Sequence, residues 1–261
     1  MKKVGIIGAG KIGGSLLLRL AESGGFDLGA SDIHSEQLKR YESAGVRTTS
    51  SNRELAEASD LVIAAVKPWD VTQVMEEISP SFEDNDKAVA SVAAGVSIAR
   101  ISESLPQGTA ILRVMPNVCA SVGLGSAVVT ANEAGRAALP TVMDIFRLVG
   151  EVQELPERLF DAATALHGSG PAYVALFADA LIQAGVREGI PRDVARRLVI
   201  ATIGGTAVLL KERSAHQVRD EVMTPGGTTA AAFVAMEKAG FVAAVYDGVE
   251  AATERARGLG G

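Results

Sequence analysis

Hydrophobic and polar positions follow two different rhythms along the chain, and the rhythm changes near Pro156. Before that residue, short apolar runs rich in β-branched residues are separated by amphipathic segments. Runs of this kind predict strands buried on both faces, as in a parallel sheet covered by helices. The predicted strands are residues 3–7, 28–31, 61–66, 87–92 and 110–114, and the predicted helices between them are 12–23, 35–44 and 71–78.

After Pro156 the β-branched runs stop and helical periodicity takes over. We expect helices at Arg158–Leu166, Pro171–Glu188, Arg192–Lys211, Ala215–Val222, Thr228–Ala239 and Phe241–Gly258. The predicted fold is therefore an α/β domain over residues 1–155, a mostly parallel sheet with helices on both faces, followed by an all-α domain over residues 156–261. The last five helical segments are too apolar to stay exposed, so we expect them to pack against a second copy of the chain.

Composition and charge narrow the class of protein. The chain has 261 residues, of which 48% are hydrophobic and 21% charged, enough for a sizeable buried core. The net charge of −6, without a basic tail or face, makes nucleic acid and an anionic membrane unexpected partners. Cys119 is the only cysteine, so an internal disulfide is excluded and a cytoplasmic location is expected. No run approaches the roughly 18 apolar residues of a membrane helix.

The first predicted strand leads into a glycine-rich turn, "VGIIGAGKIGGS", in which Gly8, Gly10 and Gly13 form G-x-G-x-x-G. The first glycine permits the tight turn, the second lets the backbone approach a pyrophosphate, and the third allows close packing of helix and strand. In this strand–turn–helix context, the pattern predicts a Rossmann-like domain that binds a nicotinamide dinucleotide. The residues expected to contact the cofactor here are Gly8, Ala9, Gly10, Lys11, Ile12 and Gly13.

The second predicted strand ends at Asp32, 22 residues after Gly10. An acid at this position can accept a hydrogen bond from the adenosine ribose 2′-OH and would repel a 2′-phosphate, which slightly favours NADH over NADPH. His34 beside it could soften that repulsion, so NADPH stays open. Alternatively, Asp32 only caps the helix expected near Ser35.

Further loops fall at the carboxyl ends of the other predicted strands, where cofactors bind in open sheets. Small residues and prolines there leave room for a ribose and a nicotinamide, although plain strand-to-helix turns would explain each loop by itself. The residues expected to line the cofactor site are Val66, Lys67, Pro68, Ala94, Gly95, Met115, Pro116 and Asn117.

Two glycine-rich helix starts lie in the second half of the chain. "HGSGPAY" contains Ser169 and Pro171, and "TPGGTT" runs from Thr224 to Thr229. Such starts present free N–H groups and a positive dipole end to an anion. Each is equally compatible with a simple turn between packed helices.

Taken in order and spacing, "GAGKIG", "AAVKP", "VAAGVS", "RVMPN", "GSGPAY" and "TPGGTT" resemble the pyrroline-5-carboxylate reductase family over almost the whole chain. The resemblance implies an NAD(P)H-binding Rossmann domain, an all-helical domain that forms an intertwined homodimer, and an active site between the cofactor domain and the helical domains. It implies reduction of the cyclic imine 1-pyrroline-5-carboxylate to L-proline.

By the same resemblance, the substrate carboxylate would bind at Thr224, Gly226, Gly227 and Thr228, with Ser169 nearby, and Thr229 would place its hydroxyl at the ring nitrogen. A threonine hydroxyl is too weak an acid to protonate the imine at neutral pH, so solvent or prior protonation of the substrate is the expected proton source. Catalysis would then rest on positioning the imine carbon against the nicotinamide.

Several alternatives remain open. The chain departs from the family pattern at Val118, Cys119 and His167, so another cyclic imine could be the substrate. A dinucleotide sensor without catalysis would keep the glycine-rich turn but has no use for "TPGGTT". A β-hydroxyacid dehydrogenase is disfavoured because its family carries a catalytic lysine on the long inter-domain helix, and residues 173–189 contain none. The three histidines show no ligand spacing, so no metal is expected.

Overall fold

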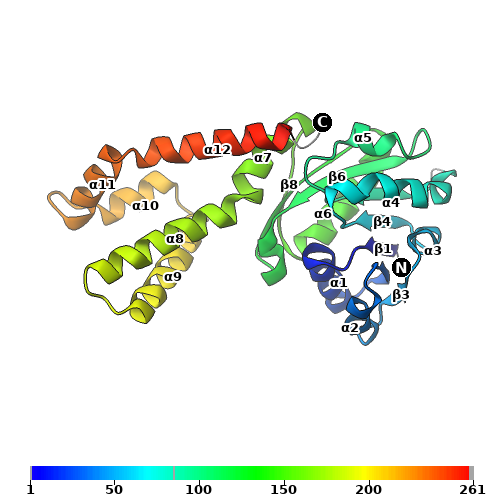
Figure 1. The fold of residues 1–261 in the computed structure, drawn as a ribbon, viewed down its shortest axis with the longest axis horizontal. Helices are drawn as coiled ribbons and strands as arrows, with labels where there is room; N and C mark the ends of the chain where they lie inside the picture. Colours follow the sequence, from blue (N-terminus) through cyan, green and yellow to red (C-terminus); the bar gives the residue numbers. More distant parts are fainter. Residues whose placement is uncertain (1, 85, 259–261) are drawn as a thin grey trace. The chain divides into compact units, whose positions relative to one another are not determined.

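The computed structural model describes residues 2–84 and 86–258 of the chain, which form a sheet-containing part and a helical part (Figure 1). The strands alternate with helices along the first part, as the hydrophobic pattern predicts. Their bounds are β1 Lys2–Ile7, β2 Phe26–Ser31, β3 Arg47–Thr49, β4 Leu61–Ala64, β5 Ala88–Ser91, β6 Ala110–Pro116, β7 Gly125–Ala131 and β8 Gly150–Glu154.

The helices of the first part are mostly short, whereas those of the second part, apart from α10, are long. The first set is α1 Lys11–Ser23, α2 Lys39–Glu42, α3 Asn52–Glu57, α4 Val71–Ile78, α5 Ile98–Ser102, α6 Leu139–Arg147 and α7 Phe160–Ala163. The second set is α8 Gly170–Arg187, α9 Arg192–Leu209, α10 Ala215–Val222, α11 Thr228–Lys238 and α12 Phe241–Arg257. The predicted helix at 35–44 is largely a 3-10 turn at Ser35–Gln37 followed by the four residues of α2.

The sheet has the strand order β3-β2-β1-β4-β5-β6-β7-β8, and all neighbours are parallel except β6 and β7. The chain moves outward from β1 to β3 and returns to the other side of β1 with β4, which places a topological switch point between β1 and β4. The sequence pattern misses β3, β7 and β8. Two of these are edge strands whose polar residues leave no clear apolar run, and in β8 only Val152 is buried.

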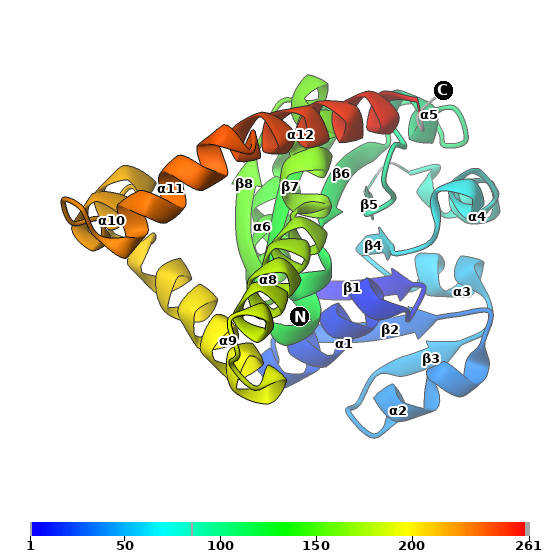
Figure 2. The same ribbon diagram turned by 60° about the vertical axis from the view of Figure 1, so that its left-hand side comes forward.

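Helices cover both faces of this sheet, since α1 and α6 contribute buried residues to one hydrophobic cluster and α3 and α4 to the other. Figure 2 shows α1 and α3 next to β1. The strands alternate their side chains between two hydrophobic clusters: Ile6 belongs to one and Ile7 to the other. Leu61 and Val62 of β4 divide in the same way. Burial on both faces confirms the parallel, helix-covered sheet that the apolar runs predict.

Two compact units make up the chain, and the division falls at Ser169. The first unit reaches Ser169 and also includes the end of α12 from Ala252, while the second unit is Gly170–Ala251. The first unit extends past the predicted boundary at residue 156 because Phe160 and Ala163 pack against Val128 of β7. The functional division at that residue stays a prediction.

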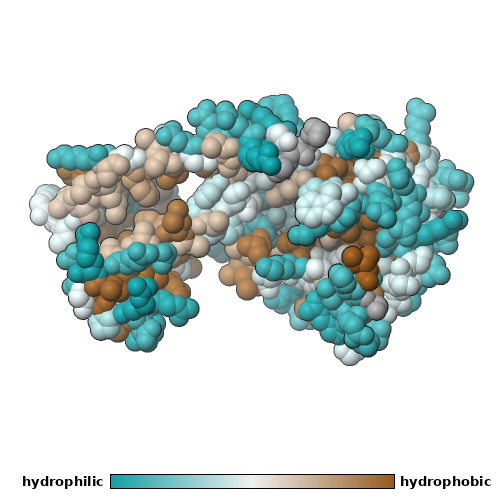
Figure 3. Space-filling model, viewed as in Figure 1, coloured by the Kyte–Doolittle hydropathy of each residue, from teal (hydrophilic) through white to brown (hydrophobic). Residues whose placement is uncertain are grey.

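The second unit differs from the first in how little of its apolar surface is buried. No residue of α8 or α11 is buried, and in α9 only Ala195 is. Figure 3 shows hydrophobic side chains at its surface. In the described part of the chain no single helix is long and apolar enough to cross a membrane; the pair α11 and α12, bent by 52°, passes that test together by length and composition alone.

Candidate functional site

The carboxyl ends of β1, β4 and β5 lie side by side, because these strands are parallel neighbours and Ile7, Ala64 and Ser91 are aligned across them. The glycine-rich turn follows β1, the loop with Val66, Lys67 and Pro68 follows β4, and the loop with Ala94 and Gly95 follows β5. The structure therefore brings these predicted cofactor residues to one edge of the sheet, at the switch point.

Each glycine of the turn has a different environment, which tests whether the turn can hold a dinucleotide. Gly8 has φ +93°, and a Cβ there would lie 2.6 Å from the Ala65 carbonyl oxygen. A Cβ on Gly13 would lie 1.9 Å from the Gly8 carbonyl oxygen, whereas one on Gly10 would meet no protein atom within 4 Å. The turn is tight at its start, closely packed at its end and open at Gly10, which fits the close approach of a pyrophosphate to the backbone.

Asp32 lies directly after β2 and holds the same turn. Its Oδ2 accepts a hydrogen bond from the Ala9 N–H at 2.7 Å, and its Oδ1 accepts one from the His34 N–H at 2.8 Å. The second bond closes an Asx turn ahead of the 3-10 turn at Ser35–Gln37. Asp32 therefore holds the backbone both in the glycine-rich turn and in the segment after β2. A contact with the ribose stays a prediction.

The Met115-Pro116-Asn117 segment ends β6, and Asn117 is committed to contacts within the protein. Its Oδ1 accepts from the N–H groups of Cys119 and Ser126, both at 3.2 Å, and its Nδ2 donates to the His167 carbonyl at 3.1 Å. Asn117 is only 9% exposed. It thus ties the end of β6 to β7 and to the segment that precedes α8, and these contacts fix the position of the carboxyl end of β6.

His167 belongs to a π-helical turn, Thr164–Gly168, which Ser169 closes by donating its N–H to the Thr164 carbonyl at 2.9 Å. Neither ring nitrogen of His167 makes a hydrogen bond of normal geometry with a described residue, and both are shielded from solvent. Burial lowers the pKa of His167 below its ordinary value, and the Ser126 backbone offsets part of that shift. The imidazole is therefore neutral at pH 7.

The predicted substrate turn belongs to the second unit. Gly227 donates its N–H to the Thr224 carbonyl at 3.0 Å, and Gly226 has φ +69°, so Thr224–Gly227 is a type II turn with proline and glycine at its centre. Helix α11 begins directly after it with Gly227 as N-cap and without a side-chain cap. Thr228 is exposed and Thr229 half-buried. The first N–H groups of α11 are thus available to an anion.

Two residues near the cofactor edge escape prediction from the sequence. Arg40 of α2 donates from Nη2 to the Ala9 carbonyl at 3.3 Å, although 31 positions separate them. Trp69, the only tryptophan of the chain, follows Pro68 and is 76% exposed. Neither lies in a motif with a characteristic spacing, so only the tertiary contact or the exposure identifies them.

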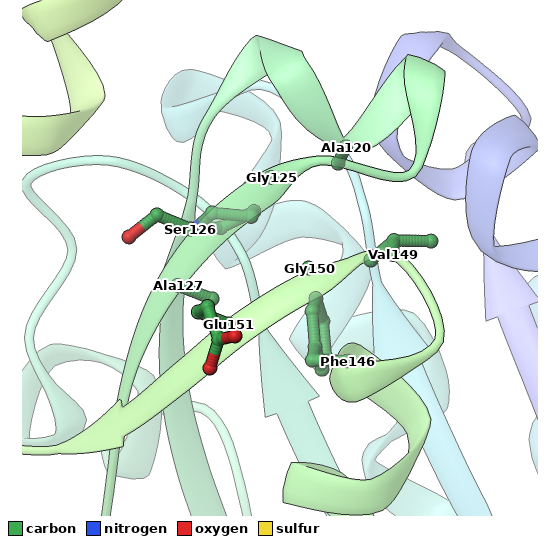
Figure 4. A pocket seen from close by; sticks show the side chains of 9 residues that line it. Ala120, Gly125, Ser126, Ala127, Phe146, Val149, Gly150 and Glu151 are labelled. Atoms are coloured by element: carbon green, nitrogen blue, oxygen red, sulfur yellow. The ribbon is translucent and has the colours of Figure 1, made fainter. Parts of the chain in front are cut away.

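Elsewhere in the described residues the structure offers little for other chemistry. No group of three or more His, Cys, Asp or Glu side chains among them is arranged to hold a metal ion. A recess between β7 and β8, lined by Ser126, Phe146 and Glu151 among others, has no room for a water molecule (Figure 4). A Cβ on Gly150 would lie 2.0 Å from the Gly125 carbonyl oxygen, so close approach of the strands fills this place.

Comparison with known families and proteins matches both parts of the chain. The family model described as "Pyrroline-5-carboxylate reductase dimerisation" matches residues 157–259, and "NADP oxidoreductase coenzyme F420-dependent" matches residues 3–95. The pyrroline-5-carboxylate reductase of Synechocystis sp. is 38% identical, covering 99% of this chain and 98% of the relative. Pyrroline-5-carboxylate reductase 3 of Rattus norvegicus is 36% identical, covering 99% and 96%.

Solved structures agree with these matches. The Plasmodium falciparum pyrroline carboxylate reductase with NADP bound has a TM-score of 0.88 at 32% identity, covering 100% of this chain and 98% of that one. The Coxiella burnetii pyrroline-5-carboxylate reductase has a TM-score of 0.94 at 31% identity, covering 99% and 98%. An imine reductase from Pseudomonas sp. shares the fold, with a TM-score of 0.64 at 14% identity.

Proposed function

The chain belongs to the pyrroline-5-carboxylate reductase family, and we infer that it reduces 1-pyrroline-5-carboxylate to L-proline by hydride transfer from a nicotinamide dinucleotide. The observation that carries this assignment is that one chain combines an open glycine-rich turn at the switch point with an uncapped helix start at "TPGGTT". The first suits a pyrophosphate and the second suits a carboxylate.

In the first unit, the backbone of the glycine-rich turn would hold the pyrophosphate, and the loops after β4, β5 and β6 would line the ribose and nicotinamide. When bound, NADH or NADPH supplies the hydride. Asp32 would accept from the ribose 2′-OH, which slightly favours NADH. The close packing of Gly13 and the hydrogen bond from the Ala9 N–H to Asp32 support this cofactor site, because a turn that is already ordered loses less entropy on binding.

In the second unit, the N–H groups of Thr228 and its neighbours at the start of α11 would receive the substrate carboxylate, with the Thr224 hydroxyl as a further donor. Thr229 would orient the ring nitrogen and stabilise the amine that forms, and Ser169, at the end of the π-turn, would also contact substrate. The ring nitrogen would arrive protonated or take its proton from solvent. Positioning of the imine carbon, not acid catalysis by a side chain, would provide most of the rate.

The exposed apolar faces of α8, α9 and α11 support a homodimer built through the helical unit. The match of residues 157–259 to a dimerisation model points the same way. We further propose a cytoplasmic location, since the single cysteine, Cys119, suits a reducing compartment.

Turnover of the imine tests the assignment. Purified protein should oxidise NADH or NADPH when 1-pyrroline-5-carboxylate is added, with L-proline as product by chromatography. Quenching of Trp69 fluorescence by NADH would report cofactor binding separately. Binding without oxidation would favour a dinucleotide sensor, and oxidation only with larger cyclic imines would favour a different substrate.

The pair Thr229→Ala and Thr228→Ala tests the site itself. Loss of the Thr229 hydroxyl should lower kcat/KM for the imine by about 1–3 kcal/mol, since the ring nitrogen would lose its partner in a closed site. Thr228→Ala should cost less, because alanine keeps the backbone N–H. Cofactor affinity should stay unchanged in both variants. Full activity in Thr229→Ala would contradict the role given to this residue.

A further inference from the structure

Ala9, between the first two glycines of the turn, is held at both of its peptide groups by charged side chains. Its N–H donates to Asp32 Oδ2 at 2.7 Å, and its carbonyl accepts from Arg40 Nη2 at 3.3 Å. The N and O atoms of one residue are separated by only about 3–4 Å. The Asp32 carboxylate and the Arg40 guanidinium therefore both border the short stretch of backbone where the adenosine end of a dinucleotide is expected.

The negative charge of Asp32 is already engaged. Both carboxylate oxygens accept backbone N–H groups, from Ala9 and from His34. Hydrogen bonds from N–H dipoles to a carboxylate are strong and partly compensate its charge. Asp32 consequently repels a nearby phosphate less than a free carboxylate in the same place would.

The positive charge of Arg40, by contrast, is not compensated by a carboxylate of the described residues. Its side chain is exposed, and within the described ranges no carboxylate lies within 4.0 Å of its guanidinium. By contrast, the nearby cations Lys39 and Arg47 pair with Glu36 and Asp27. The guanidinium lies 4.7 Å from the ring centroid of Tyr41, which is fully buried and so offers a fixed platform. One of the five N–H donors of Arg40 reaches Ala9, and the others have no described partner.

We propose that Arg40 binds the 2′-phosphate of NADPH and is the residue that gives this chain activity with NADPH as well as NADH. A planar guanidinium held in place, unpaired and beside a charge-compensated acid, matches the geometry and charge of a phosphate monoester. This inference deepens the proposed function and rests on it, because it concerns the cofactor of the same reaction.

The experiment uses adenosine 2′,5′-bisphosphate and adenosine 5′-monophosphate as probes, so that binding can be measured without turnover. In the parent protein, calorimetry should show tighter binding of the bisphosphate, because the contact of its 2′-phosphate with Arg40 outweighs the slight preference for a 2′-OH that Asp32 gives. Arg40→Met should weaken bisphosphate binding about tenfold or more, the effect of one lost charged hydrogen bond, and leave monophosphate binding unchanged. Arg40→Lys should restore part of the difference because it keeps the charge.

Lys39→Met is the matched control: it removes the same charge from the adjacent residue, whose ammonium is paired with Glu36. It should bind both probes as the parent does. In steady-state kinetics with the imine, Arg40→Met should lower kcat/KM for NADPH about tenfold and for NADH less than about twofold.

An equal loss with both probes, or with both cofactors, would mean that Arg40 only braces the Ala9 carbonyl, and would overturn the proposal. So would a parent protein that binds the two probes equally. The outcome for the imine is separate: a protein inactive on 1-pyrroline-5-carboxylate that still shows the Arg40-dependent preference for the bisphosphate would refute the proposed reaction and retain this inference.

Discussion

The sheet unit buries most of its large hydrophobic residues, whereas the helical unit exposes many of its own. In the first, Leu16, Leu17, Leu61 and Ile63 are fully buried. In the second, Leu176 is 72% exposed. A helix pair such as α8 and α9 has too few elements around it to cover its apolar faces, while a sheet covered on both sides has a closed core. The contrast teaches that the first unit has its stability within one chain and that the second needs a second copy.

The largest expected effect comes from placing a charge on the exposed apolar face. Leu176→Asp should dissociate the dimer into monomers at micromolar concentration, measured by light scattering after gel filtration. Burial of one leucine side chain contributes about 1.5–3 kcal/mol, and a two-fold interface loses it twice. Ile33→Asp is the matched control, because Ile33 is 91% exposed in the sheet unit and should leave the dimer intact. A dimeric Leu176→Asp protein would show that the helical unit does not bury this apolar face against a second copy.

Two glycine substitutions separate folding from cofactor binding within the sheet unit. Gly13→Ala should lower the free energy of unfolding by about 1–3 kcal/mol, since its Cβ would overlap the Gly8 carbonyl. Gly10→Ala should change that free energy by less than about 0.5 kcal/mol, because no protein atom lies within 4 Å. It should nevertheless weaken NADH binding, followed by Trp69 fluorescence. Normal cofactor affinity in Gly10→Ala would show that the pyrophosphate lies elsewhere.

Within the sheet unit, an ion pair with a buried member should contribute more to the free energy of unfolding than an exposed pair. Arg113 is 5% exposed and donates to Glu157 Oε1 at 3.1 Å, and the same oxygen accepts the Ile98 N–H at 2.8 Å. Glu157→Gln leaves a buried cation without its counter-charge and should cost about 2 kcal/mol in urea unfolding.

The control for that experiment is Glu154→Gln, which removes the partner of Arg136 from a pair in which both side chains are about half exposed. Its cost should stay below about 0.5 kcal/mol. Equal destabilisation by the two substitutions would show that burial of Arg113 does not matter to stability.

The smallest expected effect depends on pH. Burial lowers the pKa of His167 in the folded protein below 6.5, so the unfolded chain binds the proton first as the pH falls. Stability is therefore unaffected by this group well above pH 6.5 and decreases as the pH drops below it. Between pH 7.5 and 5.5 the melting temperature of the parent should fall more steeply than that of His167→Gln. Parallel curves would mean that His167 is not shielded in solution.

The backbone features of the predicted site are largely local, and for that reason the sequence predicts them well. The tight turn at Gly8 and the close packing of Gly13 follow from local backbone conformation, and the structure has both, with φ +93° at Gly8 and Gly13 against the Gly8 carbonyl. Helices α4 and α10 have the predicted bounds, 71–78 and 215–222. The type II turn at Thr224–Gly227 follows from proline and glycine at its centre. Each of these features is decided by a short window of residues.

Contacts between distant residues were decided only by the tertiary structure. Arg40 meets Ala9 across 31 positions, Arg113 meets Glu157 across 44, and Asn117 meets His167 across 50. The edge strand β8 likewise becomes a strand by pairing with β7, since only one of its five residues is buried. Such contacts depend on how complete elements pack, and the local pattern of hydrophobic and polar residues does not predict them. By itself the sequence therefore determined the local backbone shapes that suit a dinucleotide and a carboxylate, while packing determined which charged side chains surround them.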